Sequence, residues 1–131
     1  RADRVHVETD LIRGDVTGLA GSEADVISLH IPALTQQTYA TVMAVDRYAG
    51  VLENVRTFVA ERARRSRGVP ILAPTFTKCR DNLGEMEAWY DQWLRAVGSA
   101  VICGPSDFAG QIPDCAVADM ARSGSMVASM R

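Results

Sequence analysis

The sequence has little that would place the protein in a membrane or outside the cell. No apolar run approaches the roughly 20 residues that a membrane-spanning helix needs, and no charged and then apolar leader marks a secretory signal. The 131 residues include three widely spaced cysteines, Cys79, Cys103 and Cys115. An odd number of cysteines without a signal argues against a disulfide framework and for a reducing compartment, so we expect a cytoplasmic protein without a membrane partner.

The motifs of several common enzyme sites are also missing. The chain has no glycine-rich phosphate loop, no Ser–His–Asp spacing and no close pair of histidines or cysteines for a metal. Its formal net charge of −2 predicts no nucleic-acid partner. The basic run over 62–67 lacks interleaved aromatic residues, so we interpret its cations as complements to the C-terminal end of a helix.

A strand–helix–strand unit is the clearest pattern that is present. The apolar runs 69–77 and 99–103 are typical of buried strands. Apolar residues at three- and four-residue spacing predict a helix between them over 83–97. We expect Asn82 to cap this helix, Glu85 to complete a capping box and Gly98 to end the helix. A helix between two apolar strands is typical of a parallel sheet.

The residues before this unit predict a similar alternation. Residues 4–9 and 24–31 are expected to be strands, and 14–22 allows at most a short helix. Thr35 is expected to cap a short helix, and Asp46 the longest helix, whose buried stripe starts at Tyr48. We interpret 1–114 as one domain, and 115–131, which has no clear period, as a loose or disordered tail.

The order of these elements predicts an α/β fold. Right-handed crossovers would place the helices that start at Tyr48 and Leu83 side by side on one face of a four-stranded parallel sheet. Parallel sheets are normally covered on both faces or closed into a barrel. We therefore expect a partial (β/α) TIM-like barrel with helices on the outer face. Its bare apolar sheet face and its edges predict self-association.

Polar residues follow each predicted strand and form a candidate site. In β/α barrels the working residues lie at the carboxyl ends of the strands. His30 could act there as an acid or base, and a core histidine bonded to the backbone is the alternative. The candidates are Glu8, Thr9, Asp10, Ser28, His30, Thr75, Thr77, Lys78, Arg80, Cys103, Ser106 and Asp107.

Six blocks over residues 4–114 match the pattern of a known family. They are VHVETD, VISLHIPALTQQTY, YAGVLENVRTFVAER, GVPILAPTFTK, NLGEMEAWYDQWLRAVGSAVI and FAGQIPD. Together they resemble the radical S-adenosylmethionine (radical SAM) core domain, in the peptide-modifying branch that carries a SPASM module. The family's Cys-x-x-x-Cys-x-x-Cys motif, which holds a [4Fe–4S] cluster, is absent from this chain. The resemblance therefore implies a fragment that runs from about the third barrel strand to the sixth.

The resemblance also implies cofactors, a reaction and site residues. The parent enzyme would bind S-adenosylmethionine and a [4Fe–4S] cluster whose ligands lie outside this chain, and the isolated chain would bind no cofactor. The parent would generate a 5′-deoxyadenosyl radical and abstract hydrogen from a peptide or small-molecule substrate. The implied S-adenosylmethionine contacts are Thr9 and Asp10 near the methionine end, Ser28 at the ribose or carboxylate, His30 where the family commonly has Asp, Thr75 and Thr77 on the next strand, and Ile102 on the adenine side.

Two alternatives from other classes remain open. The chain could be a stand-alone β/α interaction module that dimerises through its exposed sheet face and meets an acidic partner through residues 62–67. It could also be an unrelated β/α-barrel enzyme with its site at His30 and Lys78. A Cys-x-x-x-Cys-x-x-Cys motif encoded before Arg1 would decide for the radical SAM hypothesis.

Overall fold

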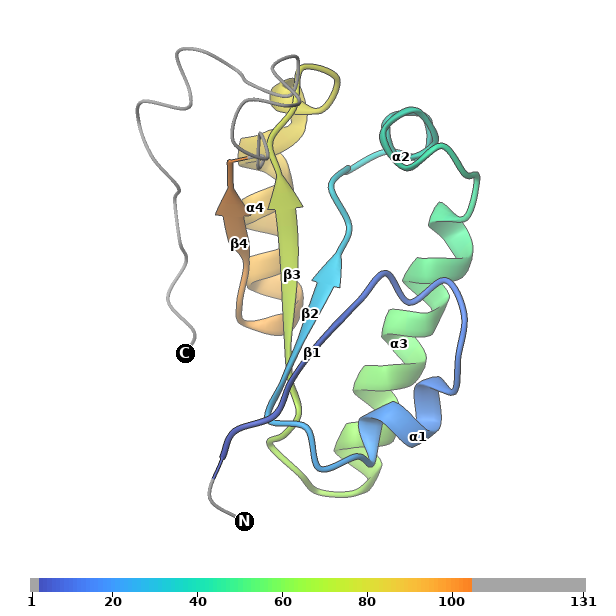
Figure 1. The fold of residues 1–131 in the computed structure, drawn as a ribbon, viewed down its shortest axis with the longest axis vertical. Coiled ribbons are helices and arrows are strands. Elements are labelled where there is room, and N and C mark those ends of the chain that lie inside the picture. Colours follow the sequence, from blue (N-terminus) through green and yellow to red (C-terminus); the bar gives the residue numbers. More distant parts are fainter. Residues whose placement is uncertain (1–2, 105–131) are drawn as a thin grey trace.

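The computed structural model describes residues 3–104, which form an α/β unit around one parallel sheet (Figure 1). The elements in chain order are β1 (His6–Thr9), α1 (Val16–Ala20), β2 (Val26–His30), α2 (Gln36–Met43), α3 (Tyr48–Arg64), β3 (Ile71–Thr77), the 3-10 turn η1 (Leu83–Glu85), α4 (Met86–Val97) and β4 (Val101–Cys103). All three strand pairings are parallel, and the strands lie in the order β1-β2-β3-β4. The predicted α/β class and strand order are thus confirmed, whereas the expected tail 115–131 lies outside the described residues.

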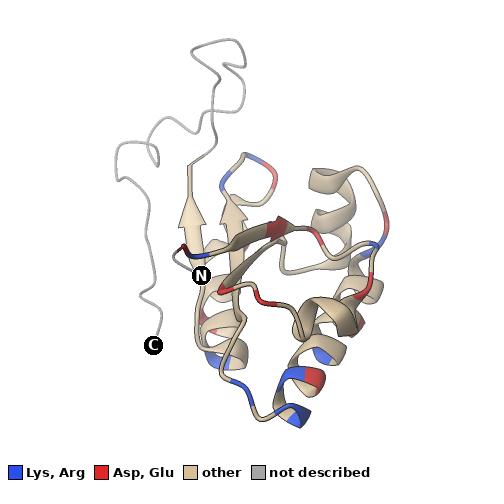
Figure 2. Cartoon of the chain, turned by 60° about the horizontal axis from the view of Figure 1, so that its bottom comes forward, with Lys and Arg blue, Asp and Glu red and all other residues tan. Residues whose placement is uncertain are grey.

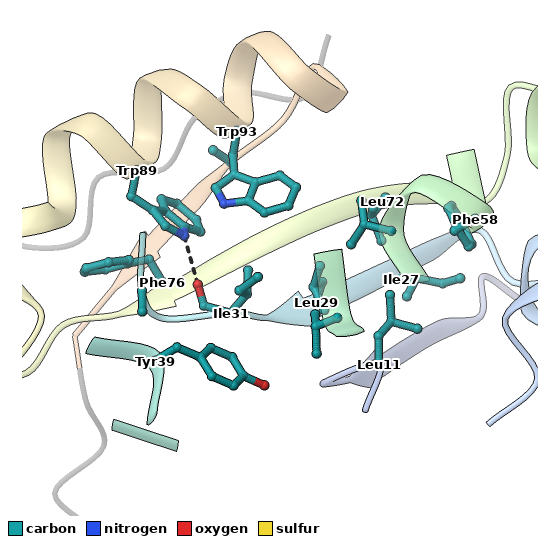
Figure 3. Close-up of a cluster of buried hydrophobic side chains, with 14 of the residues drawn as sticks. Leu11, Ile27, Leu29, Ile31, Tyr39, Phe58, Leu72, Phe76, Trp89 and Trp93 are labelled. Atoms are coloured by element: carbon teal, nitrogen blue, oxygen red, sulfur yellow. Dashed lines mark hydrogen bonds between the residues drawn. The ribbon is translucent and has the colours of Figure 1, made fainter. Parts of the chain in front are cut away.

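One face of the sheet carries the apolar core. The register sets Ile27 beside Leu72, and Phe76 beside Ile102, and all four side chains are buried under the helices. Aromatic side chains from the helices complete the core, with the Trp89 ring centroid 5.0 Å from that of Phe76 (Figure 3). Each large apolar side chain buried in this way contributes about 1.5–3 kcal/mol to folding. The core therefore holds the helices against a single face.

Helices α3 and α4 share this face but do not pack against each other. Helix α4 lies over β3 and β4, whereas α3 packs on α1 and α2 towards the other edge, and the α3 and α4 backbones do not come within 8 Å of each other. The prediction of the shared face is correct, and the prediction of side-by-side helices is wrong. Each helix is held by its own strands and neighbouring helices, so no direct contact between the two is needed.

Some helix ends are formed by the residues that the sequence predicts, whereas at others the predicted capping residue bonds elsewhere. Thr35 caps α2 as expected, with its hydroxyl accepting from Thr38 N at 3.3 Å, and Gly98 ends α4 with φ +84°. Asp46 does not cap α3; its carboxylate accepts instead from Gln36 Nε2 at 2.9 Å. Neither Asn82 nor Glu85 makes a side-chain cap at the start of α4. Glu85 bonds instead to Leu34 N and other groups at the start of α2, and Asn82 bonds to Pro32 O, Thr77 O and Cys79 N.

The basic run at the end of α3 is largely engaged in internal contacts. Arg62 donates to Pro70 O at 2.8 Å and lies over the Phe58 ring, and Arg67 donates to Gly21 O at 3.2 Å. Arg64 and Arg65 both pair with Glu61. Figure 2 shows acidic segments beside the basic ones at this end of the molecule, so the surface there is mixed in sign. Within residues 3–104 no helix is long and apolar enough to cross a membrane.

Candidate functional site on the polar face of the sheet

The second face of the sheet carries the polar side chains of the strands together with some apolar ones. None of the helices within residues 3–104 packs on this face, because the buried strand side chains that form the core with the helices point to the other side. Parallel strands usually carry apolar residues on both faces, and we expected an apolar face here. The face is mixed: Val26, Ile71, Ala73 and Val101 are apolar, and the other residues carry polar groups or a thiol. The residues of this polar face are His6 and Glu8 from β1, Val26, Ser28 and His30 from β2, Ile71, Ala73, Thr75 and Thr77 from β3, and Val101 and Cys103 from β4.

A histidine–serine pair bridges the first two strands of the polar face. His6 Nε2 and Ser28 Oγ are 2.6 Å apart, so a hydrogen bond joins them. We did not predict His6 as a site residue because the sequence argument looked only at the carboxyl ends of strands. The alternation of His6 and Glu8 in one strand, set against Ser28 in the next, was the available signal. The strand register was needed to use it.

His30 ends β2 on the same face and is half-buried. Burial lowers the pKa of His30 below its ordinary value, and the nearby carboxylates of Asp10 and Glu8 offset this only in part. The imidazole is therefore neutral at pH 7, with one nitrogen that donates and one that accepts a hydrogen bond. Thr75 lies opposite His30 in the register and brings a hydroxyl to the same place.

The predicted residues at the end of β1 have a mainly structural role. Thr9 Oγ1 accepts from Leu11 N, and Asp10 Oδ1 accepts from Ile12 N, both at 3.0 Å. These bonds hold a turn in which Leu11 takes φ +55°. By register Thr9 belongs to the helix-covered side, as Leu29 does. Asp10 lies close enough to His30 to act on its charge.

The predicted residues on β3 and β4 lie on different faces of the sheet. Thr77 Oγ1 lies 3.7 Å from Cys103 Sγ on the polar face, and Thr75 Oγ1 donates to Ala73 O at 3.3 Å. Ile102 points to the opposite face and is 1% exposed. The structure thus brings Ser28, His30, Thr75 and Thr77 onto one face and places Ile102 apart from them.

Lys78 and Arg80 follow β3 in the chain. Lys78 is 2% exposed, and its backbone N–H donates to Cys103 O at 2.9 Å. Ser106, Asp107 and Cys115 lie outside the described residues. Among residues 3–104 no three His, Cys, Asp or Glu side chains gather closely enough to hold a metal ion. A [4Fe–4S] cluster needs several cysteine thiolates, so the described residues do not fit one.

Comparisons of this chain with protein-family models, with curated proteins and with solved structures found no match. The residues and geometry of the polar face are therefore the basis on which a function is assigned.

Proposed function

We propose that this chain is an arc of a β/α barrel from a radical SAM enzyme, and that its polar face is the inner surface that binds S-adenosylmethionine. The observation that carries the proposal is the contrast between the two faces of the sheet. One face is apolar and holds all the described helices, and the other brings histidine, serine and threonine side chains together. An in-order parallel sheet with this contrast is what an arc of a barrel requires, because ligands bind inside or above the ring of strands.

The two edges of the sheet support the same proposal. A groove of about 220 Å³ lies beside the β1 edge and is lined by Val7, Leu11, Val16 and others. A second groove of about 220 Å³ lies beside β4 and is lined by Met86, Tyr90 and Ile102, with two acidic residues. Each groove lies between an edge strand and its helix, which is where the next β/α unit of a barrel would pack.

The chain's own residues would bind and orient S-adenosylmethionine. Ser28 and Thr75 present hydroxyl groups, and a neutral His30 can donate to or accept from a polar ligand. The reductive cleavage of S-adenosylmethionine would depend on a cluster held by residues that the described part of the chain lacks. Binding and orientation are therefore the role we assign to this segment, and a peptide or small molecule is the proposed substrate of the whole enzyme.

The test uses the parent protein, extended upstream of Arg1, reconstituted anaerobically and reduced. We expect it to release 5′-deoxyadenosine from S-adenosylmethionine. Ser28→Ala should raise the KM for S-adenosylmethionine about tenfold, because one lost hydrogen bond is worth about 1–1.5 kcal/mol. Thr41→Ala is the matched control, since its hydroxyl bonds only Gln37 O on an exposed part of α2. A parent without a Cys-x-x-x-Cys-x-x-Cys motif, or one that releases no 5′-deoxyadenosine, would overturn the proposal.

A further inference from the structure

Several of the hydrogen bonds that hold the eight residues after His30 come from one distant segment of the chain. This loop, residues 31–38, leads from β2 into the first turn of α2. Tyr48 of α3 also donates to Leu34 O at 2.6 Å, but three of the side chains that bond to the loop lie close together, between the end of β3 and the first turns of α4. They are Asn82, Glu85 and Trp89, and we call them the clamp.

Glu85 makes the largest number of contacts in the clamp. Its carboxylate accepts from Leu34 N at 2.6 Å, from Thr35 N at 3.3 Å, and from the hydroxyls of Thr35 and Thr38, both at 2.7 Å. Burial alone would raise the pKa of Glu85, but these hydrogen bonds outweigh it and hold the pKa below the ordinary value. Glu85 is therefore ionised at neutral pH, and it satisfies donors at the start of α2 that have no partner within the helix.

The other two members of the clamp hold the first residues of the loop. Asn82 is fully buried and donates to Pro32 O at 2.8 Å and to Thr77 O at 2.9 Å, which ties the ends of β2 and β3 together. Trp89 Nε1 donates to Ile31 O at 2.8 Å, as the dashed line in Figure 3 shows. Ile31 directly follows His30, so the clamp begins to act at the residue next to the imidazole.

We infer that Asn82, Glu85 and Trp89 are positioning residues for the polar face: by fixing residues 31–38, they keep the His30 imidazole half-buried at the rim. The clamp does not itself touch His30 in any described contact, and it acts through the path of the chain that leaves β2. The inference deepens the proposed function only in that it concerns the same face. It does not depend on which ligand binds there.

The charged groups around His30 determine which direction of change in its pKa would report a loss of positioning. Glu8 and Asp10 act on it from the β1 side, and both favour the protonated imidazole. From β3 it faces Thr75, which is uncharged. Removing the negative charge of Glu85 would by itself lower the pKa of His30, whereas access of water to a loosened rim would raise it. A rise therefore reports a change in position and not the loss of a charge.

The experiment follows the two histidines of the full chain by NMR as the pH is varied. His6 and His30 are the only histidines, so one His30→Gln variant assigns both signals. We expect Glu85→Ala to shift the His30 midpoint upward, towards the value of about 6.5 for a solvated imidazole. Glu85→Gln keeps one acceptor oxygen and should shift the midpoint less. The matched control is Glu87→Ala, which removes the same charge from an exposed position two residues along.

Trp89→Phe keeps an aromatic ring in the core and removes the indole N–H together with part of the indole ring system, so it tests the clamp through a second member. It too should raise the His30 midpoint, and it decides the question alone if Glu85→Ala does not fold. An unchanged or lowered His30 midpoint in a folded Glu85→Ala or Trp89→Phe variant would overturn the inference. The titration needs no S-adenosylmethionine, so a failure of the proposed function in the 5′-deoxyadenosine assay would leave this result standing.

Discussion

Replacement of Asn82 should destabilise the fold far more than replacement of an ordinary asparagine. The side chain is 0% exposed and makes three hydrogen bonds: its amide donates to Pro32 O and Thr77 O, and its oxygen accepts from Cys79 N at 2.9 Å. In Asn82→Ala the buried Pro32 carbonyl loses its partner, at a cost of about 1–3 kcal/mol, and the two half-buried groups lose theirs at a smaller cost. The expected loss in free energy of unfolding is therefore about 2–4 kcal/mol.

Denaturant unfolding followed by circular dichroism measures this loss, and thermal unfolding should show a fall in Tm of about 10–15 °C. Asn54→Ala is the matched control. The amide of Asn54 donates only to Leu11 O, at 2.7 Å and in a half-buried position, so about 1 kcal/mol is expected. Asn82→Asp keeps the size and the acceptor but turns an anionic oxygen towards two carbonyls. It should be as unstable as Asn82→Ala at pH 7. If Asn82→Ala loses no more stability than Asn54→Ala, the reasoning is refuted.

Four further outcomes are expected. Because native His30 binds a proton less readily than His30 in the unfolded chain, the free energy of unfolding should fall as the pH drops below about 6.5, and His30→Gln should abolish this decline. A second loss of stability should follow below about 4.3 as Glu85 is protonated. Gly98→Ala should lower the free energy of unfolding by about 1–2 kcal/mol, because φ at Gly98 is +84°. Gly50→Ala should raise it by about 0.5–1 kcal/mol, because Gly50 lies inside α3 with open space at the Cβ position. Equal effects of the two substitutions in urea titrations would contradict this. The isolated chain should self-associate at micromolar concentration through the β1 and β4 edges, so a monodisperse, cooperatively unfolding monomer in sedimentation would count against the arc. Anaerobic reconstitution of the isolated chain should leave no stoichiometric iron or sulfide after desalting, and retained cluster would show that its three cysteines can meet.

Much of the fold could be predicted because it depends on interactions between residues close in sequence. The apolar runs of β2 and β3, and the three- and four-residue spacing in α3 and α4, report burial directly. The end of α4 at Gly98 and the start of α2 at Thr35 follow from backbone geometry and one local hydrogen bond. The parallel order of the strands follows from the handedness of the connections. None of these features needs a partner from a distant part of the chain.

The polar face and the clamp were decided by the tertiary structure. Alternation along one strand shows which residues share a side, but only the register between strands shows that His6 meets Ser28 and that Ile102 lies on the opposite face from Thr75. Glu85 and Asn82 have the spacing of a local cap, yet Leu34 N, which Glu85 binds, and Pro32 O, which Asn82 binds, lie about 50 residues earlier in the chain. Buried backbone groups must find hydrogen-bond partners wherever the fold brings them. That requirement depends on the packed structure, and a local sequence pattern does not contain it.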